Sequence, residues 1–172
     1  SWNTATAFDT TYTYSPGANG SQSSQPASIT NGGSTISYEY NANGNIISIT
    51  DADGTTAYQY DELNQLVRED NHHTNQTVIY LYDAYGNILR KKIYPKTDAT
   101  TVSGTPTDEI IYGYDTDWTD KLVSYDGTGI TYDAVGNPLS YRGSTLTWTK
   151  ENMLAGVVSG TKAYTYSYDH NG

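Results

Sequence analysis

The sequence contains no cysteine, and it has only one phenylalanine and one methionine among its 172 residues. Without cysteine, the chain can form no disulfide framework, no thiolate nucleophile and no metal centre with cysteine ligands. It also lacks an apolar run approaching the ~18 residues of a membrane-spanning helix, and it shows no signal peptide. Because it begins without methionine and stops inside a recognisable motif, we expect a piece of a longer chain whose targeting signals lie elsewhere.

Positive charge is scarce as well. The chain has 9 Lys and Arg against 19 Asp and Glu, and its formal net charge is −10. A surface of that sign repels phosphate backbones, so nucleic acid is a poor partner. The one compact basic run, Arg90-Lys91-Lys92, is interpreted as a solvated face beside a strand rather than as a binding patch.

Tyrosine, in contrast, occurs 18 times, and threonine, serine, asparagine and glycine are also abundant. Tyrosine and threonine favour strands, whereas glycine, asparagine and aspartate favour turns. Aliphatic residues are too few to fill a wide core, so tyrosine rings must supply much of the buried area. This composition predicts an all-β fold, in which residues 150–155 could form one helical turn at most.

A short motif recurs along the chain. Its second tyrosine falls at positions 40, 60, 82, 114 and 132, which gives steps of 20, 22, 32 and 18 residues. Trp148 and Tyr168 extend the series by 16 and 20 residues. A period near twenty residues is typical of a repeat array rather than of a domain with one core. The copies read YEYNANGNI (38–46), YQYDELNQL (58–66), YLYDAYGNI (80–88), YGYDTDWTDKL (112–122), ITYDAVGNPL (130–139), the worn LTWTKENML (146–154) and the incomplete YSYDHNG (166–172).

Each copy predicts a β-hairpin. The two tyrosines of Y-x-Y lie two positions apart, so on a strand they share one face. The aspartate that follows can accept hydrogen bonds from backbone N–H groups just ahead of it, and the glycine (Gly44, Gly86, Gly136) suits a left-handed turn position. An aliphatic pair such as Ile88-Leu89 then starts the return strand. The expected fold is an array of antiparallel hairpins that forms one long curved or twisted sheet.

These copies resemble YD repeats, the unit of the Rhs family and its relatives, which include wall-associated proteins, the B and C components of Tc toxins, and teneurins. The resemblance covers at least residues 36–172. It implies a segment of a spiral β-shell, placed shortly before the conserved Rhs core, and in family members that shell encloses a C-terminal toxin. The Asp-Pro-x-Gly-type motif of the core autoprotease is missing here, so no catalytic residue is carried over.

The repeat divides the chain into parts. We expect residues 1–35 to hold one or more degenerate N-terminal repeats, with YTYSPGANG (12–20) as a worn copy. Residues 36–172 are expected to form the repeat array, truncated at its C-terminal end. The long step between positions 82 and 114 contains residues 95–108, which are interpreted as an inserted surface loop.

The predicted site residues are structural, and no catalytic, cofactor-binding or metal-binding residue is predicted. The carboxylate pairs Asp51/Asp53 and Asp115/Asp117 could suggest glycoside hydrolysis or calcium binding, but they lie in turns that recur with the repeat. The motif residues are Tyr38, Tyr40, Tyr58, Tyr60, Asp61, Tyr80, Tyr82, Asp83, Gly86, Asn87, Tyr112, Tyr114, Asp115, Tyr132, Asp133, Gly136, Asn137, Tyr166, Tyr168 and Asp169.

The histidines do not predict a metal site. His72 and His73 are adjacent, so on a strand they would face opposite sides, and their polar neighbours favour an exposed loop tip. His170 stands alone near the end of the sequence. We therefore expect no cofactor and no metal ion.

The aromatic side chains have two interpretations. Rings from successive hairpins could stack as ladders across neighbouring strands, each pair adding about 0.2–1 kcal/mol. They could instead form a platform for sugar rings, and the irregular Trp118 and Trp148 are then the better candidates. Recurrence of tyrosine in every unit favours the structural ladder.

The leading hypothesis is a non-enzymatic wall segment of a secreted or cell-surface YD-repeat protein. Its expected partners are the neighbouring repeats of the parent chain and an encapsulated toxin or effector polypeptide, with no nucleic acid and no membrane span. Raw sheet edges also predict edge-to-edge self-association. The alternative is an adhesion module of a bacterial surface protein that binds carbohydrate or protein.

Overall fold

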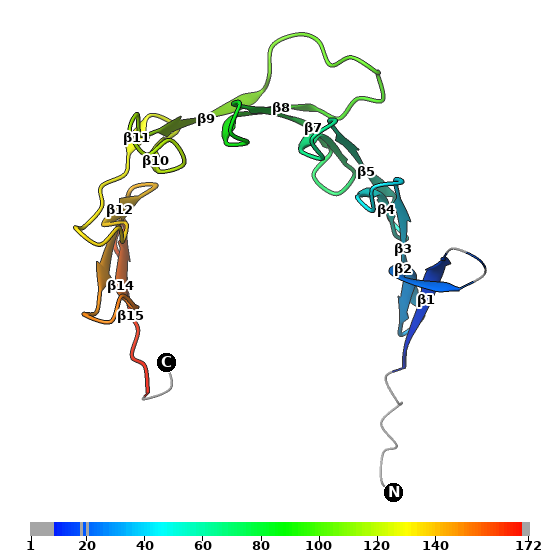
Figure 1. The fold of residues 1–172 in the computed structure, drawn as a ribbon, viewed down its shortest axis with the longest axis horizontal. Coiled ribbons are helices and arrows are strands. Elements are labelled where there is room, and N and C mark those ends of the chain that lie inside the picture. The colour runs from blue at the N-terminus through cyan, green and yellow to red at the C-terminus, as the bar shows by residue number, and fades with distance from the viewer. Residues whose placement is uncertain (1–8, 18, 20, 170–172) are drawn as a thin grey trace, which may run out of the picture. The chain divides into compact units, whose positions relative to one another are not determined.

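The computed structural model describes residues 9–17, 19 and 21–169, which contain fifteen β-strands and no α-helix (Figure 1). Within this range, no helix could therefore span a membrane. Residues 1–8 of the N-terminal segment, His170 and the end of the last motif copy lie outside the described residues. The strands are β1 (Thr10–Pro16), β2 (Gln22–Asn31), β3 (Ser34–Tyr40), β4 (Ile46–Thr50), β5 (Thr55–Tyr60), β6 (Leu66–Asn71), β7 (Gln76–Tyr82), β8 (Ile88–Pro95), β9 (Asp108–Tyr114), β10 (Leu122–Tyr125), β11 (Thr128–Gly129), β12 (Ser140–Tyr141), β13 (Ser144–Trp148), β14 (Leu154–Ser159) and β15 (Lys162–Thr165).

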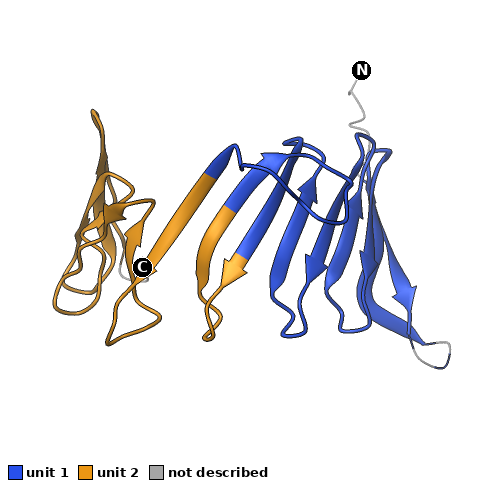
Figure 2. Ribbon diagram, turned by 90° about the horizontal axis from the view of Figure 1, so that it is seen from above, with its two compact units in different colours: residues 1–80, 92–108 blue, residues 81–91, 109–172 orange. Residues whose placement is uncertain are grey.

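The strands follow one another in space as they do in sequence. β1 to β11 form an eleven-stranded sheet in which each strand is hydrogen-bonded to the next, and β12 to β15 form a four-stranded sheet in the same way. Every strand pair with a recorded register is antiparallel. The all-β hairpin array expected from the sequence is therefore confirmed. The chain divides into two compact units, unit 1 (residues 1–80 and 92–108) and unit 2 (residues 81–91 and 109–172) (Figure 2).

The aliphatic pairs start the return strands. β4, β6, β8 and β10 begin at Ile46, Leu66, Ile88 and Leu122, directly after the turn that follows each Y-x-Y segment. A register shift precedes the turn in the first two of these hairpins, between Glu39 and Tyr40 and between Gln59 and Tyr60. The extra residue raises the local twist, and it sets the last tyrosine opposite the first aliphatic residue.

Few side chains are fully buried. Among the described residues, the buried apolar side chains are Val78 and Ile130, at 4% and 7% exposure. Thr77, at 0%, and Arg68, at 4%, are buried as well. Sheets without covering helices bury their faces only partly, so the contacts between neighbouring hairpins have to carry much of the stability.

Residues 96–107, between β8 and β9, form the long green loop of Figure 1, and we call them the strap. The strap is held on unit 1 by its own backbone. Lys96 N donates to Asn75 O at 3.1 Å, and Thr97 N donates to Thr77 Oγ1 at 3.0 Å. At its far end, Thr107 N donates to Ile93 O at 2.8 Å. The strap therefore folds back onto the sheet beside β7.

Candidate functional site

The second tyrosine of a motif copy is tied to the preceding unit by its hydroxyl group. Tyr60 Oη donates a hydrogen bond of 2.9 Å to the carbonyl oxygen of Ile46, the first residue of β4. We call this contact the latch. The same contact joins Tyr40 to Pro26 O (2.9 Å), Tyr114 to Ile88 O (3.0 Å) and Tyr132 to Leu122 O (2.5 Å).

The worn copy and the incomplete copy keep the latch as well. Trp148 takes the place of the second tyrosine, and its indole Nε1 donates to Pro138 O at 2.7 Å. Tyr168 donates to Leu154 O at 2.9 Å. Pro138 forms an isolated bridge with Tyr132. Because proline lacks only the donor, its carbonyl oxygen still accepts the latch.

The surroundings of three latch tyrosines raise the pKa of the hydroxyl group. Burial raises the pKa of the Tyr60 hydroxyl above its usual value. Burial also raises the pKa of Tyr114, and the nearby negative charge of Asp83 raises it further. For Tyr132, burial acts first and the neighbouring Tyr141 adds to it. A raised pKa favours the neutral hydroxyl, the form that can donate the hydrogen bond.

The aspartate of the motif closes the turn. Asp83 Oδ1 accepts hydrogen bonds from Tyr85 N at 2.8 Å and Asn87 N at 2.9 Å, and Asp83 Oδ2 accepts one from Asn87 Nδ2 at 2.9 Å. The Asn87 side chain is the main reason that the pKa of Asp83 lies below its usual value. Gly86, inside the turn, has a φ of +90°. Asp61 and Asp133 accept the same backbone bonds, and Asn41 and Thr149 take the place of aspartate in two other turns.

Neighbouring turns are bridged by asparagine side chains, which sequence reasoning missed. In two copies, asparagine replaces the turn glycine and has a positive φ, +61° at Asn64 and +63° at Asn152. Asn64 Oδ1 accepts from Asn45 Nδ2 at 2.8 Å, and Asn152 Oδ1 accepts from Asn137 Nδ2 at 3.0 Å. The sequence did contain a signal for these bridges, namely asparagine at the turn position where other copies have glycine. Asparagine tolerates the left-handed region and carries a side-chain acceptor that glycine lacks.

Arg68 holds the strap, and it was also missed. Its Nη1 donates to the carbonyl oxygens of Ala99 (2.8 Å) and Thr100 (3.1 Å), and its Nη2 donates to Thr97 O (2.8 Å). Its Nε pairs with Asp70 at 2.9 Å. One carboxylate and three backbone carbonyls therefore accept hydrogen bonds from four of the five N–H groups of the guanidinium. A lone arginine in a strand carries no signal of this role in the sequence.

The predicted carboxylate pairs lie in turns. Asp51 Oδ1 accepts from Asp53 N at 2.9 Å and Gly54 N at 3.2 Å. Asp115 Oδ1 accepts from the backbone N–H groups of Asp117 and Trp118, both at 2.9 Å. In the part of the chain that the structure describes, no three His, Asp or Glu side chains gather closely enough to hold a metal ion.

The two adjacent histidines differ in their environments. His73 is exposed, and its Nε2 lies 2.9 Å from Asp51 Oδ2. His72 is half-buried, and its ring packs so close to Gly54 that a side chain there would collide with it. The expectation of an exposed loop tip is therefore wrong for His72, because the preceding turn covers it.

The two tryptophan candidates also differ. Trp118 is 60% exposed and borders a hollow of about 360 Å³ together with Lys121 and Tyr132. Trp148 is half-buried in its latch. The recorded tyrosine ring contacts are edge-to-face and join Tyr112 to Tyr125 and Tyr125 to Tyr141, at 5.4 and 5.7 Å. A stacked ladder of the motif tyrosines therefore stays a prediction.

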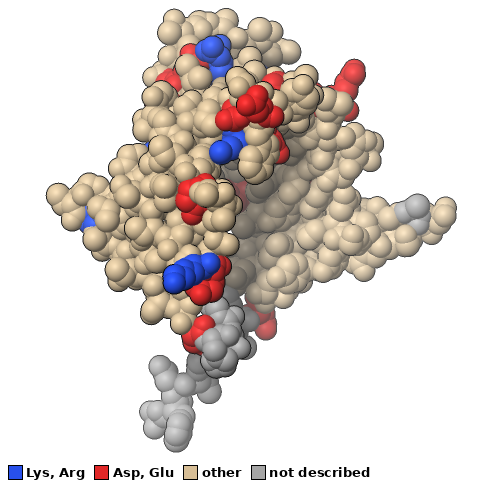
Figure 3. Space-filling view, turned by 60° about the vertical axis from the view of Figure 1, so that its left-hand side comes forward, with Lys and Arg blue, Asp and Glu red and all other residues tan. Residues whose placement is uncertain are grey.

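Charged side chains form no extended basic patch on the face drawn in Figure 3, where the few blue groups are scattered and several lie beside red ones. Arg90, from the basic run, forms an ion pair of 2.9 Å with Glu109. The arrangement fits the solvated face that the sequence predicts.

Comparison with known proteins gives a repeat family and a fold. Residues 25–56 and 40–74 match the RHS Repeat family model. The tRNA3(Ser)-specific nuclease WapA of Bacillus spizizenii is 33% identical over 117 residues, which are 66% of this chain and 4% of that protein. The chain therefore spans a small fraction of this relative.

Solved structures show the same fold. TcdB2-TccC3-TEV matches with a TM-score of 0.68 and 19% identity, over 95% of this chain and 10% of the matched chain. The Photorhabdus luminescens Tc holotoxin pore with a TccC3 mutation matches with a TM-score of 0.65 and 19% identity, over 92% of this chain and 9% of the matched chain. Together, these similarities show that residues 25–74 contain repeats of the RHS type and that the chain has the antiparallel hairpin fold of the Tc toxin structures.

Proposed function

We propose that this chain forms part of the wall of a YD-repeat shell that surrounds another polypeptide segment, and that it has no catalytic role itself. The recurring latch carries the proposal. In six copies it joins a unit to a carbonyl group of the preceding one, so the array extends by adding units rather than by enlarging a core. A wall built in this way can be long, and its stability grows with each neighbour contact.

The proposed partners follow from this role. They are the repeats on either side in the parent chain and an enclosed toxin or effector polypeptide. The named relatives support this assignment, because the chain matches short stretches of a nuclease called WapA and of a Tc holotoxin component. We place the parent protein outside the cell or on its surface.

Protease protection of the parent protein tests the proposal. We expect the enclosed segment to resist digestion while the latches are intact, and to be cleaved faster when Tyr40, Tyr60 and Tyr132 are changed together to phenylalanine. Tyr12→Phe is the matched control, because Tyr12 is 51% exposed and donates no latch. A parent protein in which every downstream segment is digested at the rate of an unfolded chain would contradict the shell.

A second candidate function is glycan adhesion, which the exposed Trp118 favours. Lys121 Nζ lies 5.7 Å from the Trp118 ring centroid and 4.6 Å from that of Tyr132, beside the hollow. A glycan array with the wild type and with Trp118→Ala and Trp148→Ala variants separates the two functions. Saturable sugar binding that only Trp118→Ala abolishes would support adhesion, and the absence of binding to any glycan would reject it.

A further inference from the structure

We propose that the hollow between β12, β13 and β14 binds a carboxylate carried on an apolar body. This hollow has a volume of about 420 Å³, and its lining residues are Tyr141, Arg142, Ser144, Leu146, Val157 and Ser159. It lies within unit 2. The inference concerns a site on one sheet face and does not rest on the proposed shell function.

The first observation is an arginine in an unfavourable backbone position. Arg142 and Gly143 form the two-residue turn between β12 and β13, and their φ values are +49° and +76°. Such turns favour asparagine or aspartate before glycine, and the corresponding turn after β10 has Asp126 there, at +47°. Arginine is poorly suited to the left-handed region, so this position costs stability that asparagine or aspartate would not cost.

The second observation is that this arginine is prepared to bind an anion. Its guanidinium carbon lies 4.8 Å from the centroid of the Tyr125 ring. Stacking of this kind holds the plane of the group while leaving its N–H donors available. Among the described residues, no carboxylate forms an ion pair with Arg142. In a chain with a net charge of −10, an arginine without an acidic partner is a free anion-binding group.

The third observation is a row of polar groups across the sheet. Tyr141 pairs with Ser144, Ser144 with Ser159, and Ser159 with Lys162. Directly paired residues share a face, so two hydroxyl groups lie between Arg142 and Lys162. Neither serine hydroxyl bonds to a described residue, and Lys162 likewise has no ion pair within the described range. Both hydroxyls can therefore donate to a bound anion.

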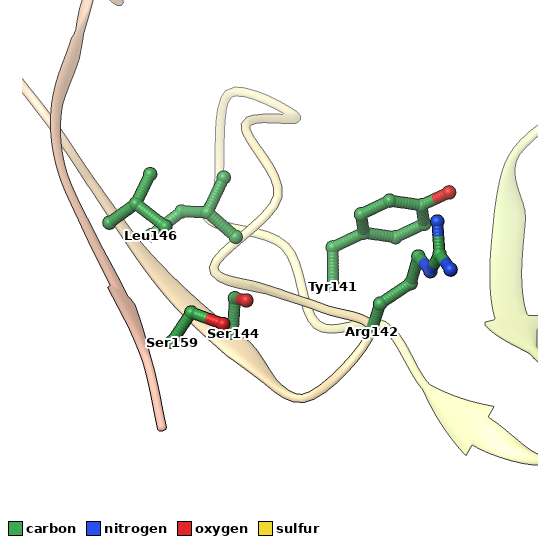
Figure 4. Close-up of a pocket in the computed structure, with 6 residues that line it drawn as sticks. Tyr141, Arg142, Ser144, Leu146 and Ser159 are labelled. Atoms are coloured by element: carbon green, nitrogen blue, oxygen red, sulfur yellow. The ribbon is translucent and has the colours of Figure 1, made fainter. Parts of the chain in front are cut away.

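The floor of the hollow is apolar and defines the rest of the ligand. Leu146 pairs with Val157, two residues along β13 and β14 from the paired serines and therefore on the same face. Figure 4 shows Tyr141 and Arg142 on one side of the hollow, with Leu146, Ser144 and Ser159 on the other. A carboxylate can engage the planar guanidinium with two hydrogen bonds, while an aliphatic body covers Leu146 and Val157. A fully hydrated inorganic anion would leave that apolar floor unused.

Two kinds of molecule carry a carboxylate on an apolar body: the C-terminus of a polypeptide and a fatty acid. N-acetylleucine represents the first, octanoate represents the second, and N-acetylleucinamide is the uncharged match. Each compound is titrated into the whole 172-residue chain, and the chemical shifts of the backbone amides are followed by NMR. We expect saturable shift changes around residues 141–146 and 157–162. For an open hollow we expect a Kd on the order of 1 mM for at least one acid. The acid that binds more tightly identifies the source.

The decisive variant is Arg142→Asn, because asparagine is preferred in this turn and the fold should tolerate it. We expect this variant to lose affinity for the acid by about tenfold or more, and Lys162→Gln to lose less. Lys150→Gln is the matched control, since Lys150 is an exposed cation in the opposite turn of the same sheet. Unchanged affinity in Arg142→Asn would overturn the site. Equal binding of the amide, tighter binding of inorganic phosphate, or no binding at about 10 mM acid would overturn it as well.

Discussion

The tyrosine hydroxyl explains the unusual composition at the scale of single residues. A phenylalanine ring could fill the same space, but only tyrosine can also donate to a backbone carbonyl. Because the acceptor belongs to the backbone, it is present whatever residue starts the return strand. Isoleucine, leucine and proline all serve, and Trp148 shows that another ring with an N–H group can replace tyrosine.

Removing one hydroxyl tests the latch. We expect Tyr60→Phe to lower the free energy of unfolding by about 1 kcal/mol, because Ile46 O loses a partly buried hydrogen bond. Urea denaturation monitored by circular dichroism measures the loss. Tyr12→Phe should change stability by less than about 0.5 kcal/mol, and equal losses in the two variants would show that the latch contributes nothing.

Turn closure by aspartate predicts a dependence on pH. Since the folded pKa of Asp83 is lower than its usual value, folding favours the charged form. The stability from this group is therefore present above that usual value and is lost as the pH falls through the folded pKa. We expect Asp83→Ala to lower stability at neutral pH and to flatten its decrease below pH ~4, as measured by urea titrations at several pH values. An acid profile that keeps its full slope in Asp83→Ala would contradict this role.

At the scale of elements, the strap shows how a long loop can help to hold the sheet. Its backbone carbonyls accept three hydrogen bonds from Arg68, and Asp70 also accepts a 2.6 Å hydrogen bond from the fully buried Thr77. Burying a guanidinium is costly unless it is paired with a carboxylate and hydrogen-bonded to further acceptors. The strap and the arginine therefore depend on each other.

Changing Arg68 should release the strap. We expect Arg68→Ala to cost about 3 kcal/mol, because the half-buried Asp70 loses its ion pair and three carbonyl groups lose a donor. Limited proteolysis should then cut within residues 96–107 before it cuts elsewhere. Arg90→Ala removes an exposed ion pair and should cost less than about 1 kcal/mol. A strap that resists protease equally in both variants would rule out the anchoring role of Arg68.

At the scale of the whole molecule, each sheet ends in a strand that has a neighbour on one side only. β15 is the last strand of the four-stranded sheet, and all of its residues are exposed. Tyr166 N donates inward to Ala155 O. Because successive backbone N–H groups of an edge strand point alternately toward the neighbouring strand and away from it, the N–H of Thr165 points outward. Unpaired edges of this kind favour pairing with other chains.

Proline at that outward position should reduce self-association. We expect the chain to associate in a concentration-dependent way, and Thr165→Pro to weaken this association without unfolding the monomer, because the lost donor faces solvent. Analytical ultracentrifugation measures the effect, with Thr165→Val as the control that keeps the N–H. A wild-type chain that stays monomeric at high concentration would contradict the prediction.

The sequence predicted much of the local structure. The repeat period located the hairpins, and the aliphatic pairs marked the starts of β4, β6, β8 and β10. That residues 95–108 are an insertion stays a prediction. Sequence reasoning treated the tyrosines as stacking rings and did not foresee their hydroxyl acceptors. It also missed Arg68, the asparagine bridges and the half-buried state of His72, because each depends on a residue in another hairpin.

The sequence by itself determined the period, the hairpin fold and the turn chemistry, because these depend on residues only a few positions apart. An aspartate can reach the N–H groups of its own turn in any context. Only the tertiary structure decided which carbonyl each tyrosine hydroxyl reaches, where the strap docks, and that Arg142 and Lys162 flank two serines on one face. Those contacts depend on the register and twist of strands that are distant in sequence, which local patterns leave open.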